Sequence, residues 1–143
     1  MAGVWGVTPR ASVRAEAARV GADAVVDRCL AVLAGETPEP PFLRVLAGPA
    51  VDGVLAGYEG GLDGRWPRVW ALRGLLHVWE PRAAGAVVAA LADDAWRCRE
   101  MAAKVVAAHR VDEALESLAP LLEDLVPRVR AAAGRARMQL SQQ

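Results

Sequence analysis

Three stretches of the sequence resemble one another: PRVWALRG (residues 67–74), WRCREMAA (96–103) and PRVRAAAG (127–134). Two weaker copies begin at Ala11 and Pro41. Each copy has one apolar anchor residue, and the five anchors are Val13, Leu43, Val69, Cys98 and Val129. They are spaced 30, 26, 29 and 31 residues apart, which is the length of one helical hairpin. The sequence therefore predicts a repeat of helical hairpins.

Each copy has the pattern of an amphipathic helix. Two residues before the anchors stand Ala11, Pro41, Pro67, Trp96 and Pro127. Proline is tolerated in the first turn of a helix, so we expect helices to start at these positions. The anchor and the third, fourth and seventh residues after it share one helical stripe. We predict that this stripe is core, with Cys98, Met101, Ala102 and Val105 in one copy and Val129, Ala132, Ala133 and Ala136 in another.

The fifth residue after each anchor is always small. These residues are Ala18, Gly48, Gly74, Ala103 and Gly134. A small residue is expected where a neighbouring helix comes too close for a larger side chain. Gly134→Leu is therefore predicted to cost more than ~1 kcal/mol by overpacking.

Shorter apolar stretches lie between the copies, over residues 23–33, 51–58, 83–91 and 112–123. We predict that they are the first helices of the hairpins, because clusters of proline and glycine separate them from the second helices. Alternation of apolar and polar residues, the pattern of a strand, is nowhere sustained. The fold class is therefore expected to be all-α, with residues 1–143 forming a single domain.

The turns between the predicted helices strengthen the repeat. Asp93 precedes Arg99 by six residues, as Asp124 precedes Arg130. With this pair, the copies resemble HEAT-like repeats, especially the short type of about 30 residues found in phycobilisome-lyase-like HEAT proteins. The resemblance is clear over residues 65–140 and degenerate over residues 8–64. It implies a right-handed α-solenoid, or superhelix, of about four to five hairpins, in which the arginines form a hydrogen-bonded ladder to the aspartates.

Solenoids of this kind bind partners along the ridge formed by their second helices. The residue before the anchor is Arg68, Arg97 or Arg128 in the three clear copies, and Leu75, Lys104 and Arg135 follow seven residues later. Trp70 stands where the family places the ladder arginine. The predicted partner-binding residues are Arg68, Trp70, Arg97, Lys104, Arg128 and Arg135. The other interpretation is an ordinary solvated face, because arginine is abundant in this chain and Glu100 interrupts the strip.

The charge balance bears on the class of partner. Residues 1–64 carry five basic and eight acidic side chains, and residues 65–143 carry twelve and nine. This mild excess is small for a nucleic-acid-binding domain. We therefore expect a non-catalytic module that binds a protein partner, with self-association through open solenoid ends as a further route. The alternative is a binder of nucleic acid or of a phosphate ligand, related to the HEAT-like alkylpurine DNA glycosylases.

The residues that most often carry chemistry are sparse or isolated. His77 and His109 have no metal-ligand spacing, and neither is followed by the glutamate found in deoxyhypusine hydroxylases. Cys29 and Cys98 are expected to be buried thiols. No nucleophile has a neighbouring general base in the sequence. We expect no catalytic site, no metal and no cofactor.

Two further features concern the surface and the compartment. The chain has five tryptophans, Trp5, Trp66, Trp70, Trp79 and Trp96, for which core packing and stacking on a partner are both open interpretations. The longest apolar run, residues 83–92, spans ten residues, about half of what a bilayer requires. No basic start is followed by an apolar stretch of signal-peptide length. The expectation is a soluble, cytoplasmic protein without membrane partners.

Overall fold

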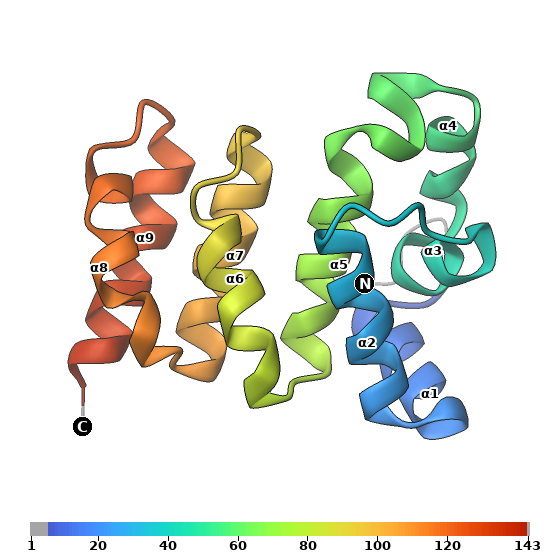
Figure 1. Ribbon diagram of the computed structural model, residues 1–143, viewed down its shortest axis with the longest axis horizontal. Helices are drawn as coiled ribbons and strands as arrows, with labels where there is room; N and C mark the ends of the chain where they lie inside the picture. Colours follow the sequence, from blue (N-terminus) through green and yellow to red (C-terminus); the bar gives the residue numbers. More distant parts are fainter. Residues whose placement is uncertain (1–5, 143) are drawn as a thin grey trace. The chain divides into compact units, whose positions relative to one another are not determined.

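A computed structural model describes residues 6–142, and all regular structure in this range is helical (Figure 1). The absence of strands over these residues confirms the predicted all-α class. Trp5, one of the five tryptophans, lies outside the described residues.

The α-helices within residues 6–142 are α1 (Pro9–Val20), α2 (Ala22–Leu33), α3 (Pro40–Ala47), α4 (Val51–Leu55), α5 (Arg65–His77), α6 (Ala84–Ala90), α7 (Trp96–His109), α8 (Leu115–Leu118) and α9 (Pro127–Ser141). From α4 onward, short and long helices alternate, whereas α1 and α2 are equal in length. Short 3₁₀ helices adjoin them: η2 (Gly48–Ala50), η3 (Tyr58–Asp63), η4 (Pro81–Ala83), η5 (Asp112–Ala114) and η6 (Pro120–Glu123). The predicted second helices of the hairpins correspond to α1, α3, α5, α7 and α9.

The chain forms two compact units. The N-terminal unit runs to Glu80 and contains α1 to α5, and the C-terminal unit starts at Pro81 and contains α6 to α9. In the N-terminal unit α3 packs against both α1 and α5, while α2 packs against α1 and α5. In the C-terminal unit α6 packs on α7, α8 packs on α9, and the two equivalent helices α7 and α9 lie side by side (Figure 1).

The long helices begin within two residues of the predicted starts. In α1 the side chain of Thr8 accepts a hydrogen bond of 3.0 Å from the backbone N–H of Ala11, and Pro9 occupies the first turn. Such a cap satisfies one of the backbone donors that have no partner within a helix. The helix therefore starts at Pro9, two residues earlier than the repeat pattern predicts.

The short helices are less regular than predicted. Residues 112–123 form three separate pieces, η5, α8 and η6, in place of one helix. Pro120 lies in the middle of this stretch, and its missing N–H and its ring oppose a continuous α-helix. The predicted helix over residues 51–58 ends at Leu55, because the chain adopts a left-handed conformation at Gly57, with a φ of 90°.

The core stripe predicted for α7 and α9 is buried except at Met101, which is half-buried. The five anchors Val13, Leu43, Val69, Cys98 and Val129 are all between 0 and 6% exposed. Each fully buried valine or leucine of this kind contributes about 1.5–3 kcal/mol by leaving water. The anchors therefore fix which face of each long helix turns inward.

The small positions are small for different reasons. A Cβ atom added to Gly74 would lie 2.9 Å from Cδ2 of Leu46 and 3.3 Å from Sγ of Cys29, so α5 does approach its neighbours there. A Cβ atom added to Gly134 would meet no atom within 4 Å. The predicted cost of Gly134→Leu is therefore wrong, because no described element covers that position of α9. Ala18 is exposed for the same reason.

Candidate functional site: a basic face and a charged pocket

The turns before α7 and α9 are built in the same way. The Asp93 carboxylate accepts a hydrogen bond of 2.8 Å from the backbone of Ala95, and the Asp124 carboxylate accepts one of 3.0 Å from Val126. The guanidinium of Arg99 donates to the Asp93 carbonyl at 2.9 Å, and that of Arg130 donates to the Asp124 carbonyl at 2.6 Å. The predicted ladder is confirmed, with each arginine bound to the backbone of its turn.

Arg99 also joins one hairpin to the next. Its Nε and Nη2 atoms donate to the two carboxylate oxygens of Asp124 at 2.8 and 3.3 Å. Both side chains are largely buried, with 19% of Arg99 and 9% of Asp124 exposed. The hydrogen bond from Arg99 is the largest cause that holds the pKa of Asp124 below its ordinary value. This pair is structural, because each of its charges is matched within the fold.

The basic face of the C-terminal unit consists of Arg97, Lys104, Arg128 and Arg135 on α7 and α9. At its centre lies Glu100, a residue of α7 that is only 6% exposed. Its carboxylate accepts two hydrogen bonds from Arg128, at 2.8 and 3.1 Å, and Lys104 Nζ lies 3.9 Å away. One buried carboxylate therefore serves two cations of this face, Arg128 and Lys104.

The ring of Trp96 lies against this face. The guanidinium carbon of Arg97 is 4.5 Å from the ring centroid, and that of Arg128 is 5.2 Å from it. Such cation–π contacts favour guanidinium groups that are held flat over an aromatic ring. Trp96 therefore positions two of the four cations.

The other two cations line a groove between α7 and α9. The groove has a volume of about 350 Å³ and is lined by Lys104, Ala107, Ala132, Arg135, Met138, Gln139 and Gln142. Arg135 is exposed and makes no ion pair with another described residue. The groove combines apolar walls with one ammonium group, one guanidinium group and the two amides of Gln139 and Gln142. Such a lining suits an extended peptide with carboxylate side chains.

The two remaining strip residues, Arg68 and Leu75, and the predicted binding residue Trp70 belong to the N-terminal unit and do not form a continuous surface. Arg68 donates a hydrogen bond of 3.1 Å to the Gly64 carbonyl at the start of α5. Leu75 is completely buried. Trp70 is 6% exposed, and its ring stacks on that of Trp66 with the two ring centroids 6.0 Å apart. Trp70 is therefore a core residue, and we leave it out of the binding surface, which corrects its assignment from the sequence.

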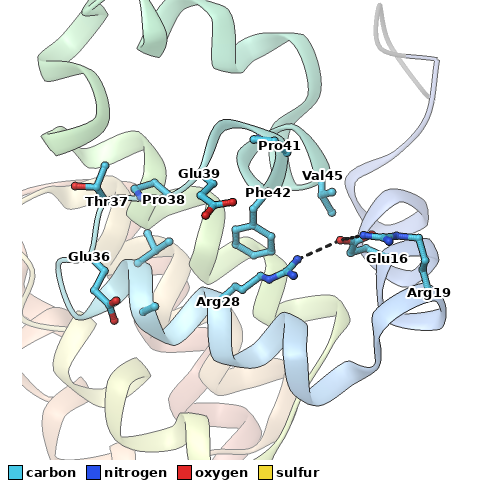
Figure 2. Close-up of a pocket in the computed structure, with 12 residues that line it drawn as sticks. Glu16, Arg19, Arg28, Glu36, Thr37, Pro38, Glu39, Pro41, Phe42 and Val45 are labelled. Carbon is cyan, nitrogen blue, oxygen red and sulfur yellow. Dashed lines mark hydrogen bonds and ion pairs between the residues drawn. The ribbon is translucent and has the colours of Figure 1, made fainter.

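The N-terminal unit contains a pocket that the repeat pattern does not predict. Its volume is about 470 Å³, and α1, α2, α3 and the segment before α3 line it (Figure 2). Glu16 is 8% exposed and accepts hydrogen bonds of 2.8 and 3.0 Å from Arg19 and one of 3.3 Å from Arg28. The Arg28 guanidinium also lies 5.7 Å from the centroid of the Phe42 ring.

The position of Glu16 in the repeat is the signal that sequence reasoning missed. It stands three residues after the anchor Val13, where the other copies have Leu46, Leu72, Met101 and Ala132. A carboxylate on an otherwise apolar stripe needs a charged partner, because an unpaired buried charge is too costly. The partners are Arg19, one helical turn later, and Arg28 on α2.

The Glu16 network predicts a stability difference that depends on pH. The hydrogen bond from Arg19 is the largest cause that lowers the pKa of Glu16 below its ordinary value. A lowered pKa means that the carboxylate stabilises the fold above the ordinary pKa of glutamate, about 4.3, and that this contribution disappears as the pH falls through the lowered value. We expect Glu16→Gln to lower the free energy of unfolding by about 1 kcal/mol at neutral pH.

Urea unfolding of both proteins over a range of pH checks this expectation. The difference between them should shrink as the pH falls below about 4, where Glu16 becomes protonated in the original protein. A difference that stays constant down to acid pH would contradict the assigned role of the carboxylate.

The other candidate residues have ordinary surroundings. Cys29 and Cys98 are buried thiols, and burial raises the pKa of Cys29 to about 12, so that its thiolate is not formed at neutral pH. Within residues 6–142, no cluster of three histidine, cysteine, aspartate or glutamate side chains is placed to hold a metal ion. No helix in that range is long and apolar enough to span a membrane.

Comparison with protein-family models, with curated proteins and with solved structures finds no significant match to the chain.

Proposed function

We propose that the chain is a HEAT-like repeat protein, a right-handed solenoid of four to five hairpins, that binds a partner protein without catalysis. The binding surface is the basic face of α7 and α9, and the segment that it binds is acidic. The observation that carries this proposal is the groove between α7 and α9, in which Lys104 and Arg135 flank apolar walls. The repeat spacing and the lateral packing of α7 on α9 support the HEAT-like assignment.

The charges of the basic face favour an acidic partner. Arg128 shares Glu100 with Lys104, so one negative charge is divided between two cations. Arg135 adds a further positive charge to the same pair of helices, and it makes no ion pair with another described residue. An acidic segment would complete this arrangement with charge-assisted hydrogen bonds, which are the stronger kind.

The surroundings of Trp96 favour a peptide over a nucleic acid. Proteins that bind single strands use open aromatic faces on which the bases stack. The guanidinium groups of Arg97 and Arg128 already lie over the Trp96 ring, where a base would stack. The ring supports the cations and does not offer a stacking platform, so nucleic acid becomes an outcome of the test.

Calorimetric titration of the full chain with a flexible peptide rich in glutamate tests the proposal. We expect Arg135→Glu to weaken binding about tenfold, because it removes one attraction and adds one repulsion, together about 1.4 kcal/mol. Binding should also weaken as the salt concentration rises.

Arg137→Glu is the matched control. Arg137 is also an exposed arginine of α9, two residues away, but it lies outside the groove of Lys104 and Arg135. Both variants change the net charge equally, so equal losses of affinity would contradict a localised site. Tighter binding of a DNA duplex than of the peptide, with a steep salt dependence, would replace the peptide by nucleic acid.

A further inference from the structure

The pocket of the N-terminal unit has two ends with different charge. Figure 2 shows Glu16 and Arg19 on one side of it, the segment from Glu36 to Glu39 on the other, and Phe42 and Arg28 between them. At the first end the Glu16 carboxylate binds both arginines. The two positive charges of the pocket, on Arg19 and Arg28, therefore already share the buried Glu16 carboxylate.

The second end of the pocket is negative. Neither the Glu36 nor the Glu39 side chain forms an ion pair or hydrogen bond with a described residue, although both line the pocket. Taking all the charged groups that line it, three carboxylates face two guanidinium groups. The unmatched charge is negative, which favours a cationic ligand over an anionic one.

The wall between the two ends is apolar at Ala31 and Val32, whereas the Arg28 guanidinium lies over the Phe42 ring. Val32 and Phe42 are 5 and 6% exposed, and Ala31 and Val45 extend the same surface. The segment around Glu39 also has prolines on both sides, Pro38 and Pro40. Proline fixes the backbone φ angle, so the acidic rim is stiff before any ligand arrives, which reduces the entropy lost on binding.

We propose that this pocket binds an alkylguanidinium or alkylammonium group, with its aliphatic chain on the apolar wall of Ala31 and Val32 and its charge at the rim that carries Glu36 and Glu39. Arginine and lysine side chains of a protein partner carry this chemistry, and so do free diamines. An aliphatic stem on an apolar wall with a charged head at a polar rim is the usual arrangement of such groups. This site goes beyond the proposed function, because it lies in the other unit and has the opposite charge preference.

The test compares a blocked tripeptide with a central arginine with the same peptide containing citrulline, the neutral isostere of arginine. Binding to the full chain is followed by calorimetry and by the ¹⁵N–¹H NMR signals of residues 28–45. We expect the arginine peptide to shift those signals and the citrulline peptide to bind at least about tenfold more weakly, as expected when a charge-assisted hydrogen bond is lost. The second arm of the test uses a diamine, 1,5-diaminopentane. Tighter binding of the peptide identifies a side chain of a protein partner as the ligand, whereas tighter binding of the diamine identifies a free cation.

Two variants locate the charge. Glu36→Gln/Glu39→Gln changes only exposed side chains, so the fold should persist, and it should weaken the arginine peptide at least about fivefold. Glu113→Gln/Glu116→Gln, with the same change in the other unit, should leave the affinity unchanged. Equal binding of arginine and citrulline peptides, or the same affinity in the pocket variant and the control, would overturn the proposal. So would tighter binding of a glutamate peptide at residues 28–45.

Discussion

Gly74→Leu should destabilise the N-terminal unit by about 3 kcal/mol, the upper end of the range for overpacking. Even the first added carbon would lie 2.9 Å from Cδ2 of Leu46 and 3.3 Å from the sulfur of Cys29. Those two side chains are 1 and 0% exposed, so neither has space into which it can move. The free energy of unfolding in urea, at constant m-value, measures this effect.

Gly134→Leu is the matched control, with the opposite expectation. Gly134 lies inside α9, and a Cβ atom there meets no atom within 4 Å. A glycine inside a helix costs up to about 1 kcal/mol relative to better helix formers, so this variant should be neutral or slightly more stable. Equal destabilisation by both variants would show that the repeat symmetry, and not the local contact, decides which positions must be small.

Breaking the pair of Arg99 and Asp124 should be the second large effect. Asp124→Ala removes both hydrogen bonds from Arg99 and the cap on the Val126 N–H, and it leaves a largely buried guanidinium without its carboxylate. We expect a loss of about 2–3 kcal/mol in the free energy of unfolding. Because the lowered pKa of Asp124 reports stabilisation of its charged form, this loss should be largest above about pH 4 and fade below it.

A double-mutant cycle separates the pair from its surroundings. The coupling between Arg99→Ala and Asp124→Ala should be about 1 kcal/mol or more. Arg130→Ala is the control, since exposed Arg130 contacts Asp124 only through the backbone carbonyl, and it should cost less than about 1 kcal/mol. Additive effects of Arg99→Ala and Asp124→Ala would contradict a link between the two hairpins.

The apolar periodicity of the sequence was enough to predict the long helices and their buried faces. The anchors Val13, Leu43, Val69, Cys98 and Val129 are buried because an amphipathic helix has only one face suited to a core. The turn pairs of Asp93 with Arg99 and of Asp124 with Arg130 also follow from local spacing. Such features depend on neighbours within one hairpin or the next.

Features that depend on more distant neighbours were not predictable in the same way. Gly74 and Gly134 are equivalent in the repeat pattern, yet one faces two buried side chains and the other faces open space. Leu75 occupies a strip position and Trp70 is a predicted binding residue, but both are buried and cannot form part of a binding surface. Whether a face of a helix is covered depends on the elements that pack around it, and not on its place in the repeated sequence pattern.

The charged residues show the same limit. In the sequence, Glu100 interrupts the predicted basic strip. In the structure, its carboxylate accepts two hydrogen bonds from Arg128, 28 residues later, and so helps to position a residue of the basic face. Glu16 has a similar place in the pocket of the N-terminal unit. Glu16 could have been recognised as buried from its place on the core stripe, whereas Glu100 lies off that stripe. The partners that satisfy both carboxylates depend on tertiary contacts.

The proposed binding surface on α7 and α9 is tested most directly by mapping where an acidic peptide binds. ¹⁵N–¹H NMR spectra of the full chain, recorded as a glutamate-rich peptide is added, report each backbone amide separately. If the basic face is the binding surface, we expect saturable shifts at residues 97–107 of α7 and 128–139 of α9, and the loss of these shifts in Arg135→Glu. Shifts confined to the N-terminal unit, or no shifts at low salt, would contradict the claim that the basic face of α7 and α9 is the binding surface.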